Sequence, residues 1–151
     1  PMLRDNVPWD ALRDFAPITQ AASSPNILVV HPALPVRSVR ELIALAKAKP
    51  GALSDAGANT GSSAHLTAEL FKAMGKLDIT QISYKGNGIA LNALIAGEVQ
   101  MEIATPGSVM PYIKPGRLRA LAVTTPKRAE QLPHVPTFVE TGLKGFEMTN
   151  W

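Results

Sequence analysis

The sequence predicts an α/β fold with a mostly parallel central sheet and helices on both faces. Strand-like apolar runs alternate with segments of helical periodicity about five times along the chain. The connections between them are short, as in sheets whose strands are joined by crossover helices. Turns rich in glycine and hydroxyl side chains follow three strands, at 57–63, 84–88 and 104–108. Ligands of such sheets bind at the carboxyl ends of the strands.

Composition supports a globular chain and excludes several classes of protein. Apolar residues make up 46% of the 151 residues and charged residues 18%, which excludes a disordered segment. The net charge of +3 comes from scattered Lys and Arg with few aromatic residues, so no nucleic-acid partner is expected. Cysteine is absent, which excludes disulfides and thiolate metal sites. No apolar run reaches the length of a membrane span, and one α/β domain is expected over 1–151.

The chain is predicted to begin with an irregular arm over residues 1–14, which mix proline, tryptophan and charge. Strand-like residues follow at 15–18 and 26–31, and Ser23-Ser24-Pro25 should break them apart. The second strand contains the apolar run Ile27-Leu28-Val29-Val30.

A helix is predicted from Val39 onward. Ser38 and Glu41 have the spacing of a capping box, in which two side chains cap the first backbone N–H groups of a helix. Apolar residues recur at helical spacing after this box, and Pro50-Gly51 should end the helix.

The later elements alternate in the same way. The predicted strands cover residues 53–56, 78–84, 99–104, 118–123 and 146–149. The predicted helices begin after the turns at 57–63, 84–88 and 104–108, and a short fourth one covers 136–140. Gly75 and Gly97 should end the first two of these helices.

The loop from Gly57 to Ser63 is the first candidate for a binding site. Glycine lets the backbone turn and lets a ligand approach, and Ser62 or Ser63 can cap the following helix. The remaining N–H groups at the positive end of the helix dipole can receive an anion. We interpret the loop as a carboxylate-binding site, although the loop alone leaves open an ordinary capped turn. The candidate ligand-binding residues are Asn59, Thr60, Gly61, Ser62, Ser63, Ala64 and His65, then Tyr84, Lys85 and Gly86, then Ala104 and Thr105.

Catalytic motifs are incomplete. Gly86-x-Gly88 lacks the third glycine of a dinucleotide fingerprint, and the chain has neither a phosphate-binding loop nor a Gly-x-Ser-x-Gly elbow. Ser62 and His65 could meet on a helix, but no acid is placed to orient the imidazole. His31 and His134 are too far from His65 in sequence to suggest a metal cluster. We therefore expect no enzyme, cofactor or metal; the alternative is a nucleotide-dependent or hydrolytic α/β domain whose catalytic residues lie elsewhere.

A set of segments in a fixed order carries a resemblance to a known family. They are Asp14-Phe15-Ala16-Pro17-Ile18-Thr19, Leu42 to Gly51, Gly61-Ser62-Ser63-Ala64-His65-Leu66, Tyr84-Lys85-Gly86, Gly116-Arg117-Leu118-Arg119-Ala120-Leu121-Ala122-Val123-Thr124 and Leu132-Pro133-His134-Val135-Pro136-Thr137. Over essentially its whole length the chain resembles the Bug-type solute receptors of tripartite tricarboxylate transporters. Each segment is weak alone, but the ordered set is specific.

The resemblance implies a periplasmic type II binding protein of two α/β domains, which holds a small carboxylic acid in the cleft between them. It also implies delivery to a membrane permease and no enzymatic activity. The family's Pro-Gly-Gly-x-x-Asp loop has no match here, so the resemblance implies the second domain, with the first domain absent. Many relatives carry Asp after the strand that ends at Ile103, where this chain has Ala104-Thr105. That departure argues against an amino-acid ligand and favours a plain carboxylic acid.

Overall fold

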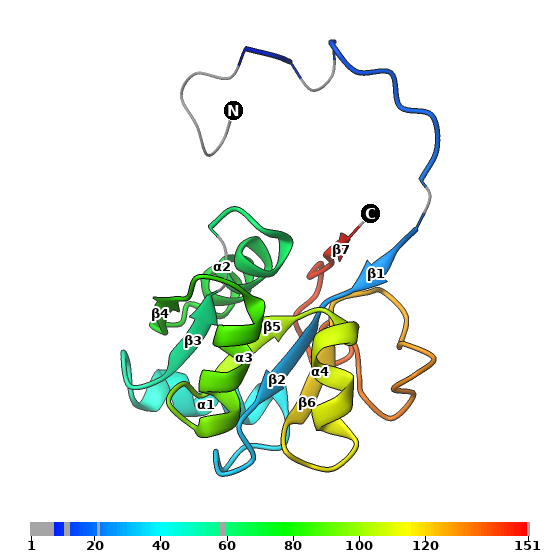
Figure 1. The fold of residues 1–151 in the computed structure, drawn as a ribbon. Coiled ribbons are helices and arrows are strands. Elements are labelled where there is room, and N and C mark those ends of the chain that lie inside the picture. The colour runs from blue at the N-terminus through cyan, green and yellow to red at the C-terminus, as the bar shows by residue number, and fades with distance from the viewer. Residues whose placement is uncertain (1–7, 11–12, 21, 58–59, 151) are drawn as a thin grey trace.

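The computed structural model describes residues 8–10, 13–20, 22–57 and 60–150. Its centre is a five-stranded sheet in the order β4-β3-β5-β2-β6, and a two-stranded sheet joins β1 to β7 (Figure 1). The strands are β1 (Ser24–Pro25), β2 (Ile27–Val30), β3 (Ser54–Gly57), β4 (Thr80–Ser83), β5 (Met101–Ala104), β6 (Arg119–Val123) and β7 (Thr149–Asn150). The helices are α1 (Val39–Ala48), α2 (Ser63–Gly75), α3 (Asn87–Ala96) and α4 (Pro106–Ile113).

The central sheet is mixed, with β2 as its one reversed strand. β3 runs parallel to β4 and β5, whereas β2 is antiparallel to both of its neighbours, β5 and β6. Strands β3, β4, β5 and β6 therefore share one direction, which confirms the mostly parallel sheet. β2 follows the short strand β1 rather than a crossover helix, so no such connection fixes its direction. Because β3, β4 and β5 are parallel, the turns after them meet at one edge of the sheet, as predicted.

Side chains of β2 show how the sheet is buried on both faces. Leu28 and Val30 lie in an apolar cluster with residues of α1 and α2, and Ile27 and Val29 lie in a second cluster with residues of α3 and α4. Successive side chains of a strand point to opposite faces, so a strand covered on both sides reads as an uninterrupted apolar run. The prediction of helices on both faces is confirmed.

Local capping signals set the beginnings of α1 and α2. The N–H of Glu41 donates to Ser38 Oγ at 3.2 Å, and the Glu41 carboxylate accepts from the N–H of Arg37 rather than from that of Ser38. In α2 the N–H of His65 donates to Ser62 Oγ at 3.2 Å. Of the two candidate caps of α2, Ser62 is therefore the cap, and the next residue is the first of the helix.

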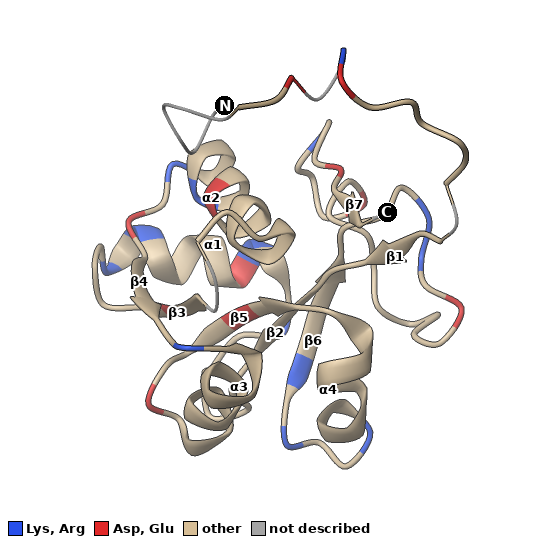
Figure 2. Ribbon diagram, turned by 45° about the horizontal axis from the view of Figure 1, so that its top comes forward, with Lys and Arg blue, Asp and Glu red and all other residues tan. Residues whose placement is uncertain are grey.

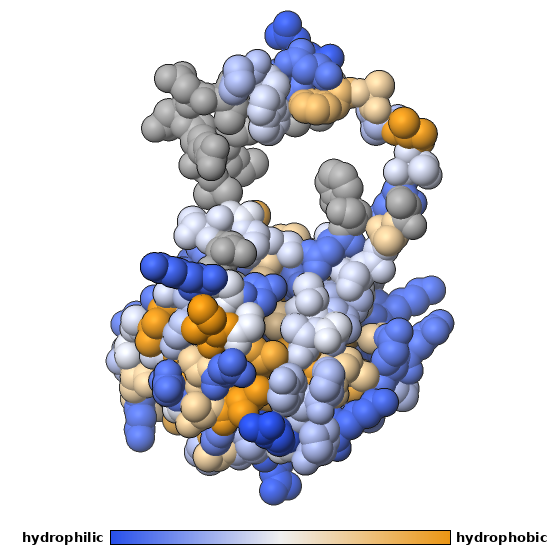
Figure 3. Space-filling model, viewed as in Figure 1, coloured by the Kyte–Doolittle hydropathy of each residue, from blue (hydrophilic) through white to orange (hydrophobic). Residues whose placement is uncertain are grey.

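Two predicted elements are wrong. Residues 15–18 form no strand: the segment arches away from the body (Figures 1 and 3), and Phe15 and Ile18 are 60% and 97% exposed. No strand among the described residues pairs with this segment, so it lacks the backbone hydrogen-bonding partner that a stable strand requires. The predicted helix at 136–140 is a turn. Thr137 and Glu140 each accept the other's backbone N–H with a side-chain oxygen, which satisfies that backbone within a single turn.

The predicted break at Ser23-Ser24-Pro25 is also wrong, because Ser24 and Pro25 form β1. In the antiparallel pair, Ser24 lies opposite Asn150 and Pro25 lies opposite Thr149. β1 leads into β2, whose Ile27 pairs with the last residue of β5. The β1/β7 pair therefore stands beside the same sheet edge at which the three turns meet (Figure 1).

Candidate functional site

A groove of about 570 Å³ lies at this edge, between the start of α2, the start of α4 and the β1/β7 pair. It is lined by Ser24, Ser63, Leu66, Thr105, Met148, Thr149 and Asn150. None of these seven residues carries a charge, and most of them carry a hydroxyl or an amide group. An anion in the groove would therefore meet polar groups and no lining carboxylate.

The first turn of α2 offers backbone donors to this groove. The Leu66 N–H makes the first helical bond, to the Ser62 carbonyl at 3.0 Å, and the His65 N–H is taken by the Ser62 hydroxyl oxygen. The N–H groups of Ser63 and Ala64 precede these bonds and have no acceptor within the helix. They lie at the positive end of the helix dipole, where a negative charge is stabilised.

Helix α4 begins at the groove in a similar way. Thr105 is its N-cap and Pro106 occupies the first turn, so the first available N–H of the helix belongs to Gly107. The Ser108 hydroxyl donates back to the Thr105 carbonyl at 2.8 Å, and the Thr105 side chain makes no cap bond to the backbone. The Thr105 hydroxyl makes only a long contact of 3.4 Å with the Ser108 hydroxyl in the first turn of α4.

Backbone contacts fix the turns that surround the groove. The Tyr84 N–H donates to the Gly57 carbonyl at 2.8 Å, which joins the turn after β4 to the turn after β3. The Gly61 N–H donates to His65 Nδ1 at 3.2 Å. His65 thus makes the local hydrogen bond expected of a first-turn residue, and the Gly61 N–H already has an acceptor.

The structure brings only part of the predicted site together. Ser63 and Thr105 line the groove, and Gly61, Ser62, Ala64 and His65 form the turn that leads into it. Thr60 and Lys85 are exposed, Gly86 is the N-cap of α3, and Tyr84 and Ala104 pack in the apolar cluster under α3 and α4. Asn59 lies outside the described residues. The loop after β3 therefore reaches the groove only where α2 begins, and the turn after β4 does not line the groove.

Sequence reasoning missed the wall of the groove that β1 and β7 form. The residues of this wall are Ser24, Met148, Thr149 and Asn150. A strand is predicted at 146–149, whereas the strand in the structure is β7 at Thr149–Asn150, and its partner at 24–25 is more than a hundred residues away. Pairing over that distance leaves no local pattern in the sequence.

Two acidic residues lie within the five-stranded sheet, one in β3 and one in β5 (Figure 2). Asp55 is 1% exposed and Glu102 is 3% exposed. Burial raises the pKa of Asp55 to about 7, and the Lys72 ammonium opposes this rise. Burial, with a smaller contribution from the charge of Asp55, raises the pKa of Glu102 to about 8.

These two carboxyl groups do not form an acid–base pair in the groove. Asp55 pairs across the sheet with Met101, which lies in the cluster under α1 and α2, whereas Glu102 pairs with Val29, which lies in the cluster under α3 and α4. Cross-strand partners share a face, so the carboxyl groups point to opposite faces of the sheet. Neither of them lines the groove.

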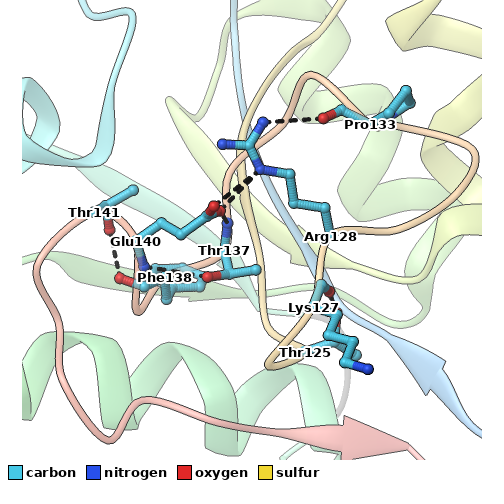
Figure 4. Close-up of polar contacts among 8 residues, drawn as sticks. All are labelled: Thr125, Lys127, Arg128, Pro133, Thr137, Phe138, Glu140 and Thr141. Carbon is cyan, nitrogen blue, oxygen red and sulfur yellow. Dashed lines mark hydrogen bonds and ion pairs between the residues drawn. The ribbon is translucent and has the colours of Figure 1, made fainter.

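One of two basic residues beside β1, Arg128, makes internal contacts. A second groove, of about 460 Å³, includes Lys127 and Arg128 in its lining. The Arg128 Nε donates to both carboxylate oxygens of Glu140, at 3.0 and 3.1 Å, and one terminal nitrogen donates to the Pro133 carbonyl at 3.0 Å (Figure 4). The hydrogen bond from Arg128 lowers the pKa of Glu140. Arg128 therefore closes the 128–140 loop, with its side chain 45% exposed at the second groove.

Surface features of the described residues narrow the choice of function further. Lys and Arg are spread over loops, helices and β6 rather than gathered on one element (Figure 2). Within the described ranges, no three His, Asp or Glu side chains lie close enough to hold a metal ion. No helix in those ranges combines the length and apolarity needed to cross a membrane. The uncharged groove with its helix N-termini remains the candidate site.

Comparisons with known proteins identify the family to which the chain is similar. The family model described as "Tripartite tricarboxylate transporter family receptor" matches residues 1–151. Protein BugT of Bordetella pertussis is 37% identical over 149 residues, which cover 99% of this chain and 46% of BugT.

Solved structures are also similar to this chain over most of its length. The structure of Rpa4515 from R. palustris with adipate has a TM-score of 0.84 at 39% identity, covering 95% of this chain and 48% of that one. The periplasmic binding protein BugD has a TM-score of 0.80 at 29% identity, covering 84% of this chain and 42% of BugD. The chain thus spans less than half the length of these proteins.

Proposed function

The chain belongs to the tripartite tricarboxylate transporter receptor family, and from this premise we propose that its groove binds the carboxylate of a small organic acid. One observation carries the proposal: α2 and α4 both begin at a groove whose lining has no charged side chain. Two helix N-termini at one groove favour a negative charge there and disfavour a positive one.

Binding would use backbone and hydroxyl donors. A carboxylate oxygen would accept from the N–H groups of Ser63 and Ala64, and the hydroxyls of Ser62, Ser63 and Thr105 would donate directly or through water. Each charge-assisted hydrogen bond of this kind is worth about 1.5–3 kcal/mol. Lys85, which is exposed and outside the groove lining, would add only an attraction that salt screens.

The ligand class follows from the same lining. Rpa4515 was solved with adipate, a dicarboxylate without an amino group. The groove of this chain has Thr105 where an acidic side chain would be needed to pair with a ligand ammonium. We therefore propose plain carboxylic acids rather than amino acids. An enzyme domain remains the alternative, and the groove offers it neither a charged nucleophile nor a base.

We propose further that the chain is one of two lobes of a periplasmic receptor. BugD is described as a periplasmic binding protein, and this chain matches less than half of it. A second lobe, absent from this chain, would close over the groove, with β1 and β7 as the strands next to the junction. A membrane permease would then receive the ligand from the closed receptor.

Titration of the 151-residue chain, followed by NMR, tests the proposal. Adipate should shift the amide resonances of Ser63, Ala64, Thr105 and Gly107, with a dissociation constant in the millimolar range or above, because one wall leaves the carboxylate in contact with water. The matched control is 1,6-hexanediol, which has the same length without charge and should shift none of them. An equal response to the diol, or no response to any of a panel of carboxylic acids, would contradict carboxylate binding. Micromolar affinity would contradict the two-lobe arrangement.

A further inference from the structure

A line of hydrogen bonds, buried at its centre, connects the two walls of the groove. Asn150 Nδ2 in β7 donates to Asn26 Oδ1 at 3.0 Å, and Asn26 Nδ2 donates to Thr67 Oγ1 of α2 at 3.2 Å. The Thr67 hydroxyl then donates to the Ser63 carbonyl at 2.5 Å. Asn26 and Thr67 are completely buried, so water does not compete for the bond between their side chains, and the two end bonds are partly buried. The line begins and ends at residues that line the groove.

Main-chain bonds hold the centre of this line in place. The Asn26 N–H donates to Thr124 Oγ1 at 2.8 Å, and the Thr124 N–H donates to the Asn26 carbonyl at 3.0 Å. The Met148 N–H donates to the Thr124 carbonyl at 3.1 Å, next to β7. With its backbone fixed at the start of β2, Asn26 has its side chain free to join β7 to α2.

The direction of the bonds is the same at every step. Each group donates toward α2, and the last acceptor is the carbonyl of Ser63, whose peptide unit also contains the N–H of Ala64. Hydrogen bonds that share a direction polarise one another, and a peptide whose carbonyl accepts becomes a better donor through its N–H. The Ala64 N–H is one of the two α2 donors that have no acceptor within the helix.

We infer that Asn26 and Thr67 are positioning residues for the carboxylate site. They hold β7 and the first turn of α2 at a fixed separation, and they strengthen the Ala64 N–H as a donor to the ligand. This inference rests on the proposed carboxylate binding at the groove. Neither side chain touches the ligand, because both are buried beneath the groove lining.

The test replaces the hydroxyl at the centre of the line. Thr67→Val keeps the shape of the side chain but removes its donor and its acceptor. The matched control is Thr137→Val, since Thr137 is also buried and its hydroxyl oxygen accepts the Glu140 N–H at 3.1 Å, away from the groove. Thr67→Ser restores the hydroxyl and should restore the wild-type properties.

Two readouts separate positioning from general stability. In the ligand-free chain, Thr67→Val should shift the side-chain amide resonances of Asn150, at the far end of the line, and Thr137→Val should leave them unchanged. With adipate as the probe, Thr67→Val should weaken binding roughly three- to tenfold relative to the wild type, and Thr137→Val should not. Thr67→Ser should match the wild type in both readouts.

Unchanged Asn150 resonances in Thr67→Val, or equal effects of both valine substitutions on adipate affinity, would overturn the inference. If Thr67→Val does not fold, Asn150→Ala removes the first donor instead, and its effect on the Ala64 amide resonance decides the question. A wild-type chain that binds no carboxylic acid would contradict the proposed function. The ligand-free resonances would still decide whether the hydrogen-bond line couples β7 to α2.

Discussion

The ring of Phe146 stacks on the ring of Phe138, with centroids 4.1 Å apart and planes inclined by 28°. Phe138 also contacts the ring of Phe71 in α2, at 5.6 Å. This aromatic series holds the chain segment just before β7 against the helix whose first turn forms the other wall of the groove. The position of β7 therefore depends on a buried side chain outside the groove.

Phe146→Ala should lower the free energy of unfolding by about 3–5 kcal/mol, because it leaves a cavity beside Phe138. It should also speed amide exchange at Met148 and Thr149, which is measurable by NMR together with urea unfolding. Val139→Ala is the control, since Val139 is a nearby but exposed apolar residue and should cost little. Equal losses in both variants would contradict the anchoring role of Phe146.

Ser62→Ala and Ser38→Ala form a matched pair of cap variants. Each serine accepts a backbone N–H three residues ahead at 3.2 Å, in α2 and α1 respectively. Each substitution should therefore lower the free energy of unfolding by about 1 kcal/mol. Only Ser62→Ala should weaken adipate binding, by roughly two- to fivefold, because α2 begins at the groove and α1 does not. Calorimetry that finds the same affinity for both variants would refute this difference.

Thr105→Asp should reverse the charge preference of the groove. The new carboxylate would lie among the groove-lining residues and would repel a bound anion, so affinity for adipate should fall roughly tenfold, or about 1.4 kcal/mol. Thr105→Asn has nearly the same shape as the Asp variant without the charge and should bind adipate much as the wild type does. The comparison requires titration at low salt, and a similar loss in the Asn variant would assign the effect to shape.

Stability should fall as pH rises because of Asp55 and Glu102. Their pKa values are raised from 3.8 and 4.5 to about 7 and about 8 in the folded chain. The folded state therefore holds more protons than the unfolded state between these values. Their contribution is fully present below about pH 4 and is lost as pH rises through 7 and 8.

Each of the two groups should contribute a slope of up to about 1.4 kcal/mol per pH unit within its window. Urea unfolding at pH 5 and at pH 8 measures the difference. The double variant Asp55→Asn, Glu102→Gln should remove most of the slope, whereas Glu147→Gln, at an exposed position, should not. A wild-type protein that is more stable at pH 8 than at pH 5 would contradict the raised pKa values.

Features that depend on local sequence were predicted well. The apolar run Ile27–Val30 predicts a buried strand, and Ser38 and the pair Ser62-Ser63 predict the starts of two helices, because period and capping act over a few residues. The wrong strand prediction at residues 15–18 has the same cause. The apolar residues of this segment have the local pattern of a strand but no strand to pair with among the described residues.

The groove was predicted only in part. Ser63 and Thr105 follow strands and can be found by their position, but Asn150 and Ser24 reach the groove through a pairing between distant segments. The same holds for the hydrogen bonds of Asn26, whose partners lie 41 and 124 residues away. Asp55 and Glu102 are buried against the usual preference of carboxylates, and nothing in their sequence surroundings indicates it.

Because Ser24 pairs with Asn150, the chain enters and leaves the folded body at neighbouring positions. A unit whose two ends are neighbours can be inserted into a loop of a host protein. The ends of that loop then need to separate by only about one strand spacing, so the host fold is not disrupted. Recombination could thus move residues 24–150 between hosts as one piece. A graft of this segment into a surface loop of an unrelated, stable protein should leave both the host and the groove folded.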